Sequence, residues 1–110
     1  MKNKIINLIK DFNSKPYGRY PEDGEGCGEN FRKFLVDQLK NNDTVHVELT
    51  GYNRYGRSFI DEAFGGLIRV DGYTLRELRK KLTYSHKDIK SIESLIDERL
   101  EKAESDADRG

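Results

Sequence analysis

The sequence predicts an α/β (α+β) domain in which helices pack on one face of a mixed β-sheet of about four strands. Three observations predict this fold. Val45, Val47 and Leu49 alternate with polar residues, which is the period of a half-buried strand. Apolar residues recur at helical spacing from Phe59 to Ile68. Short apolar stretches and helical patterns alternate along the chain, which favours a layered fold. The polar residues at 46, 48 and 50 indicate that one sheet face is less covered.

The composition is that of one small domain. The chain has 110 residues, which we divide into a single domain at 1–104 and a polar C-terminal tail at 105–110. Twenty basic and twenty acidic side chains give a formal net charge of zero, so the whole molecule lacks the field of a nucleic-acid-binding or membrane-surface protein. The charge is locally uneven, because residues 21–30 hold four acidic side chains and no basic one.

The cysteine and the apolar stretches predict a cytoplasmic protein. Cys27 is the single cysteine and cannot form an internal disulfide, which fits a reducing compartment. No apolar run reaches membrane-spanning length, and the apolar run among the first residues is too short for a signal peptide. Cys27, His46 and His86 lack the spacing of metal ligands, so we expect no metal and no cofactor. Each histidine is expected at the surface or at a sheet edge.

The first half of the chain is expected to form a strand, a hairpin return and a helix. Residues 4–9 are apolar and β-branched enough for a strand. Turn chemistry follows at 11–16, and residues 17–20 are then expected to be the return strand of a hairpin. A loop rich in glycine and acid spans 21–28. Residues 29–40 carry Phe31, Phe34, Leu35 and Leu39 on one helical face.

The second half is expected to end in two helices. Asp71 and Gly72 mark a turn, and Thr74 with Glu77 forms a capping box that opens a short helix. Residues 82–84 form a short strand or a loop. The last helix is expected to begin at Ser85 or Lys87, and its apolar face consists of Ile89, Ile92, Ile96 and Leu100.

The central turn carries the candidate functional residues. Tyr52, Arg54, Tyr55 and Arg57 fall in what we expect to be an exposed turn, and tyrosine and arginine are typical of interface hot spots. Ser58 is expected to be the N-cap of the next helix, with Asp61 as its capping-box partner. The predicted partner-binding residues are Tyr52, Arg54, Tyr55, Arg57, Ser58, Asp61 and Glu62.

Ser58 admits two interpretations. A phosphate at a helix N-terminus meets free N–H groups and the positive end of the dipole, so Ser58 is a candidate phosphorylation site. The alternative is a plain cap, because Asp61 and Glu62 in the same turn would repel the phosphate. These two carboxylates are i and i+1 on a helix, about 100° apart, and are not expected to converge on one atom.

Gly65 and Gly66 predict close packing. Each glycine inside a helix costs roughly 1 kcal/mol relative to alanine, so a neighbouring element must approach closely enough to offset that cost. Gly66→Leu is therefore expected to destabilise the fold.

Two motifs resemble a known family. The stretch from Cys27 to Arg32 is similar to an SGExFR helix start, and the stretch from Ser58 to Leu67 is similar to SFLDEAFGGL. Both resemble the STAS-like domain family of unknown function, and Cys27 stands where that family usually has serine. The family is related in fold to STAS domains and anti-sigma-factor antagonists. The resemblance implies a sheet backed by helices, a partner protein such as a GHKL-type ATPase or kinase, and, in some members, a switch by serine phosphorylation.

We therefore predict a non-enzymatic regulatory module that binds a partner protein through residues 51–62. One alternative is a small enzyme or nucleotide-binding domain that uses the loop from Gly24 to Gly28, with Cys27 or Asp61 as the reactive group. Another is a phage or mobile-element protein that inhibits a host complex. A homodimer is compatible with the fold, and a nucleic-acid partner is not expected.

Overall fold

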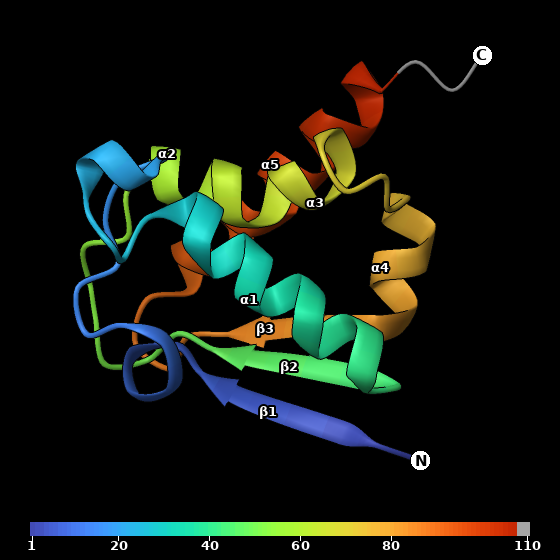
Figure 1. Ribbon diagram of the computed structural model, residues 1–110, viewed down its shortest axis with the longest axis horizontal. Coiled ribbons are helices and arrows are strands. Elements are labelled where there is room, and N and C mark those ends of the chain that lie inside the picture. The colour runs from blue at the N-terminus through green and yellow to red at the C-terminus, as the bar shows by residue number, and fades with distance from the viewer. Residues whose placement is uncertain (108–110) are drawn as a thin grey trace.

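The computed structural model describes residues 1–107, and the last three residues of the predicted tail, 108–110, lie outside the described residues. Its described part contains a three-stranded sheet in the order β1-β2-β3, with helices packed over one face (Figure 1). The α/β fold with helices on one face is confirmed. The strands are β1 Asn3–Asn7, β2 Thr44–Glu48 and β3 Leu82–Ser85.

The sheet differs from the expectation in two respects. It has three strands in the described residues instead of about four, and both pairs are parallel instead of mixed. The physical reason is that helices lie between successive strands, so each chain crossing returns the next strand in the same direction. The expected hairpin return at 17–20 forms no strand.

One face of the sheet is uncovered, as the polar residues of the central strand indicate. Ile6, Val45 and Val47 point into the core and are buried. On the other face Ile5, His46 and Thr83 lie side by side in register, and Ile5 is 70% exposed. His46 Nδ1 lies 2.6 Å from Thr83 Oγ1, and its Nε2 lies 2.8 Å from Ser85 Oγ. Parallel sheets are usually covered on both faces, and here hydrogen-bonded polar side chains line most of the open one.

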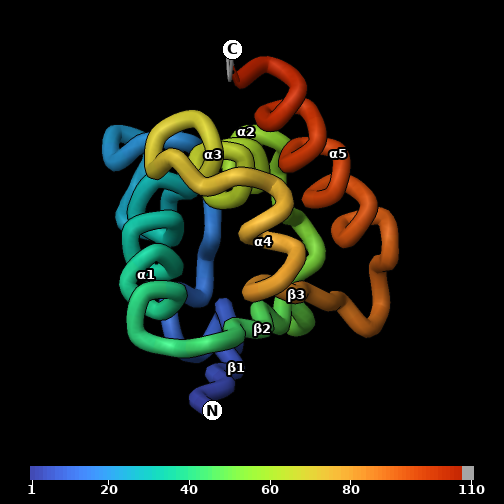
Figure 2. The backbone as a smooth tube through the Cα atoms, turned by 90° about the vertical axis from the view of Figure 1, so that its right-hand side faces the viewer, coloured from blue at the N-terminus to red at the C-terminus, as the bar shows by residue number. Residues whose placement is uncertain are grey.

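In the described residues one buried central helix lies between two long helices. The central helix runs without a break over residues 57–69 and packs against both neighbouring long helices, α1 and α5 (Figure 2). Its middle turn has π-helical geometry, which is often found at functional sites. The bounds are α1 Gly28–Asn41, α2 Arg57–Ile60, η3 Asp61–Gly65 (the π-helical turn), α3 Gly66–Arg69, α4 Leu75–Lys81 and α5 Lys90–Asp106.

The segment between β1 and α1 is irregular. After Asn7 the chain enters a π-helical turn, η1 Leu8–Phe12, so the predicted strand at 4–9 ends early. Residues 17–19 then pair with the glycine-rich loop: Tyr17 N donates to Gly26 O at 3.0 Å, and Gly28 N donates to Gly18 O at 2.9 Å. These bonds occupy backbone groups that a hairpin would have used. A short 3₁₀ turn, η2 Pro21–Asp23, completes the loop.

The second half of the chain agrees more closely with the elements predicted from the sequence. The capping box is confirmed, because Thr74 Oγ1 accepts from Glu77 N and Glu77 Oε1 accepts from Thr74 N. Of the two possibilities left open at 82–84, the structure has the strand, β3. Helix α5 begins later than expected, at Lys90, and continues two residues beyond position 104 to Asp106. No helix among residues 1–107 is long and apolar enough to cross a membrane.

Candidate functional site

The carboxyl ends of the three strands lie at one edge of the sheet, and the turn at 51–56 leaves β2 there (Figure 1). In open α/β sheets this edge is where ligands are usually bound. The irregular segment after β1 and the residues after β3 reach the same edge. We call the turn at 51–56, together with the first helical residues 57 and 58, the turn surface.

Tyr55 anchors the turn surface from below. Its side chain is buried, with 8% exposed, and its hydroxyl donates a hydrogen bond to Leu49 O at 2.8 Å. The Tyr55 ring packs edge-to-face on Tyr52, with 5.1 Å between centroids. Burial raises the pKa of the Tyr55 hydroxyl well above its ordinary value. The expectation of an exposed Tyr55 is therefore wrong, because its ring completes the core beneath the turn.

His86 holds the turn from the side of β3. Its ring is fully buried, and Nδ1 accepts from Asp88 N at 3.1 Å and from Ile89 N at 3.0 Å. Since Nδ1 accepts, Nε2 carries the proton and donates to Tyr52 O at 2.9 Å. The expected surface position is therefore wrong for His86, and its hydrogen bonds explain why α5 starts only at Lys90. His46 does lie at the surface, on the open sheet face.

The helix start differs from the expectation by two residues. The N-cap is Gly56, so Ser58 is the second residue of the helix and its side chain is exposed. Asp61 takes no part in a capping box. Arg54 and Arg57 are exposed, and Arg57 Nη2 lies 3.0 Å from Glu98 Oε1 of α5. Ser58 lines a cavity of about 340 Å³ to which Arg19, Arg57 and the acidic Asp23 also contribute.

Asp61 and Glu62 lie inside the molecule, with 8% and 5% exposed. Arg19 Nη1 contacts both, at 2.7 Å from Asp61 Oδ2 and 3.4 Å from Glu62 Oε1. The expectation that these carboxylates do not converge on one atom is thus wrong, because both side chains reach the same guanidinium from the π-helical turn. Among residues 1–107 the other basic partners within 4 Å are Arg32, Arg69 and Arg99.

This arginine cage keeps Asp61 ionised. Burial alone would raise the pKa of Asp61, but the hydrogen bond from Arg19 and the charge of Arg69 outweigh it and lower the pKa. A deprotonated carboxylate whose charge is balanced by arginines is a poor proton acceptor. The role of the cage is therefore structural. The four arginines could not be assigned from the sequence, since Arg19 and Arg32 lie 42 and 30 residues from their acidic partners.

Gly65 and Gly66 make room for the cage. A Cβ atom at Gly66 would lie 2.7 Å from Arg32 Cδ, and one at Gly65 would lie 2.7 Å from Arg69 Nη1 and 3.4 Å from the backbone oxygen of Arg99. Close packing at these glycines is confirmed. The neighbours are arginine side chains and helix α5.

The glycine-rich loop places Cys27 in the core. Cys27 is fully buried as the N-cap of α1, and its side chain makes no cap hydrogen bond. Close helix contact explains Gly28, where a Cβ would lie 2.7 Å from Phe59 O. Among residues 1–107 no three His, Cys, Asp or Glu side chains are grouped so as to hold a metal ion.

The fold and site define a small α/β domain with an open sheet face and a buried ionic cage beneath an exposed arginine-and-serine turn. A family model described as a STAS-like domain of unknown function (DUF4325) matches residues 27–88, more than half of the chain. The chain therefore belongs to this STAS-like family. The matched range includes α1, the turn surface and the central helix. No curated protein and no solved structure matches the chain significantly.

Proposed function

We propose that the protein is a non-enzymatic regulatory module that binds a partner protein through the turn surface, with Ser58 as a phosphorylation switch. A STAS-like domain is consistent with a regulatory or protein-interaction role. The observation that supports the proposal best is the exposed Ser58 hydroxyl at the start of the central helix, in one cavity with Arg19 and Arg57. A GHKL-type ATPase or kinase is the candidate partner that the family resemblance suggests.

The buried residues determine which side chains a partner would contact. Arg54, Arg57 and Ser58 are exposed, and Tyr52 is partly so. Tyr55, Asp61 and Glu62 are buried and would act by holding these residues in place. The contact residues of the proposed interface are therefore Tyr52, Arg54, Arg57 and Ser58.

The arginine cage also removes an objection to phosphorylation. Asp61 and Glu62 would repel a phosphate on Ser58 if they were free, but four guanidinium groups neutralise them. A phosphate on Ser58 would meet the helix dipole and compete with Asp61 for Arg19. The modification would thereby change both the charge of the turn surface and the attachment of the first loop, the segment 13–20 that carries Arg19.

The enzyme alternative has less support. Cys27 is buried without a side-chain hydrogen bond, and Asp61 is an ionised member of the cage. Neither has the accessibility that a reactive group needs.

Affinity capture from a host lysate with three baits tests the proposal. The baits are the wild-type protein, the charge-reversal variant Arg54→Glu/Arg57→Glu, and the control Arg76→Glu, which reverses an exposed arginine on α4. The expected result is a protein captured by wild type and control but lost by the double variant, with a phosphate mapped to Ser58. All baits should first give the same melting temperature.

Two results would contradict the proposal. If the double variant captured the same proteins as wild type, the turn surface would not be the interface. If a purified partner bound Ser58→Asp, Ser58→Ala and wild type with equal affinity, the switch at Ser58 would be excluded and the interface would remain.

A further inference from the structure

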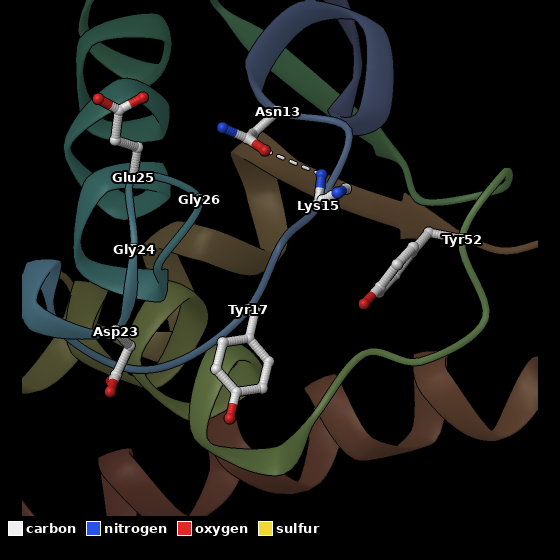
Figure 3. A pocket seen from close by; sticks show the side chains of 8 residues that line it. All are labelled: Asn13, Lys15, Tyr17, Asp23, Gly24, Glu25, Gly26 and Tyr52. Carbon is white, nitrogen blue, oxygen red and sulfur yellow. Dashed lines mark hydrogen bonds between the residues drawn. The ribbon is translucent and has the colours of Figure 1, made fainter.

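A second cavity lies beside the Ser58 cavity and shares Tyr17 and Asp23 with it. Its volume is about 590 Å³, and it opens between the segment around Tyr17, the loop at 23–26 and the ring of Tyr52 (Figure 3). Small-ligand and side-chain pockets commonly have volumes of roughly 300–1,000 Å³. The cavity is at the carboxyl-terminal edge of the sheet, the usual binding edge of such folds.

The walls of this cavity are held in place by the backbone. Tyr17 N donates to Gly26 O at 3.0 Å, and Lys15 N donates to Asn13 Oδ1 at 2.8 Å. A Cβ at Gly26 would lie 2.4 Å from Lys15 O, so only glycine lets the two wall segments approach this closely. The cavity is therefore a preformed feature of the loop packing.

Two aromatic rings face the open space. Figure 3 shows Tyr17 and Tyr52 projecting from separate segments, and both line the cavity. Tyr17 is 67% exposed, which is unusual for a large aromatic side chain and leaves its ring free for a ligand. Tyrosine faces carry negative charge density and attract cations, above all the planar guanidinium group.

The charged residues around the cavity, like the tyrosine rings, favour a cationic ligand. Asp23 and Glu25 lie on the wall opposite Tyr52, and Lys15 is the one basic residue of the lining (Figure 3). Asp23 Oδ2 accepts hydrogen bonds from Arg19 N and Tyr20 N, and the exposed Glu25 side chain points away from the two tyrosine rings in Figure 3. The acidic excess continues beyond the cavity, because residues 21–30 hold four acidic and no basic side chains. Glu25 makes no ion pair among residues 1–107. An anion such as phosphate would be repelled.

We infer that this cavity receives an arginine side chain from a basic segment of the partner protein. The guanidinium would stack on Tyr17 and Tyr52, and the exposed Glu25 side chain would turn from its position in Figure 3 to attract it. The inference rests on the proposed function, because it names what the partner contributes next to the turn surface. Lys15 opposes binding, since its ammonium group has the charge of the ligand.

Amide NMR of the whole protein tests the inference with blocked tripeptides. The probes are acetyl-Gly-Arg-Gly-amide, its glutamate counterpart and its phenylalanine counterpart. Only the arginine peptide is expected to give saturable shifts, confined to the amides around Tyr17, Gly26 and Tyr52, with a Kd on the order of 1 mM. Equal or tighter binding of another peptide, shifts located elsewhere, or no saturation would overturn the inference.

Three variants define the contacts. Tyr17→Ala should weaken arginine-peptide binding about threefold, and Glu25→Gln should weaken it about twofold. Lys15→Gln should strengthen binding, which is the opposite of the result for an anionic ligand. Glu101→Gln on α5 changes the net charge as Glu25→Gln does, far along the chain from the cavity, and should leave the Kd unchanged. If Lys15→Gln weakens binding, the assigned charge of the ligand is wrong.

The two proposals can fail separately. If the turn-surface variant loses its partner and the arginine peptide does not bind, the cavity inference alone is overturned. If the peptide binds at the cavity and the turn-surface variant keeps every captured protein, the arginine site remains and the partner surface at 51–58 is wrong.

Discussion

Tyr55 and His86 each connect the turn surface to the core through one backbone oxygen. The Tyr55 hydroxyl donates to Leu49 O, one residue after β2, and the His86 ring donates to Tyr52 O. Both side chains are buried, so a lost bond would leave a carbonyl without a partner inside the protein. The shape of the exposed turn therefore depends on residues that a partner would never contact.

At the residue scale, we predict that Tyr55→Phe lowers the free energy of unfolding by about 1–2 kcal/mol. The ring would still fill its space, but Leu49 O would lose its buried hydrogen bond. Urea denaturation of the variant and wild type measures the change. Tyr17→Phe removes a hydroxyl from a tyrosine that is 67% exposed and should change stability by less than about 0.5 kcal/mol. Equal effects of the two variants would contradict the assigned role of Tyr55.

At the scale of elements, the central helix combines a π-helical turn with two glycines. The π-helical turn carries Asp61 and Glu62, and the glycines that follow leave space for the arginines that bind them. A regular helix with larger residues at 65 and 66 would collide with Arg32 and Arg69. The helix geometry and the ionic cage are therefore one structural unit.

We predict that Gly66→Leu destabilises the protein strongly and that Gly66→Ala already costs about 1–3 kcal/mol. The new Cβ would displace Arg32, whose guanidinium binds both Glu62 and Asp71. Thermal and urea unfolding measure the effect. Gly56→Ser is the matched control, because a Cβ at Gly56 meets nothing within 4 Å and serine is a good N-cap. An unchanged melting temperature of Gly66→Leu would disprove close packing there.

At the scale of the whole molecule, the cage joins four parts of the fold. Arg19 comes from the first loop, Arg32 from α1, Arg69 from the end of the central helix, and Arg99 from α5. Removing one partner from such a buried cluster leaves an uncompensated charge, which typically costs several kcal/mol. The cage is therefore expected to make the packing of these parts depend on the ionisation of Asp61.

We predict that stability falls in acid because of this dependence. The pKa of Asp61 is lowered in the folded protein from its ordinary value of 3.8, and the pKa values of Glu48 and Glu93 are also lowered. Folding therefore gains stability from the three ionised carboxylates above about pH 4, and loses it as the pH falls through the lowered values. Urea midpoints measured from pH 7 down to pH 2.5 should decrease steadily.

Asp61→Asn tests the source of this pH dependence. The variant should be less stable at pH 7 and should lose less stability on acidification than wild type. Asp88→Asn, at an exposed position, should keep the slope of wild type. A wild-type slope in Asp61→Asn would show that other carboxylates cause the acid sensitivity.

Local patterns predicted much of the fold. Alternation identified β2, helical spacing identified α1 and the central helix, and the Thr74 capping box marked the start of α4. The motif around Ser58 indicated the family that the chain proved to belong to. These features depend on residues a few positions apart, and hydrogen-bonding and packing preferences act directly at that range.

The sequence by itself therefore determined the fold class, the family and the position of the candidate turn. Only the tertiary structure decided that the strands are parallel, that Tyr55, Asp61 and Glu62 are buried, and that Ser58 is exposed behind a glycine cap. The physical reason is distance along the chain. Burial and ion pairing depend on segments such as the first loop and the central helix, which lie about 40 residues apart and meet only in the folded molecule.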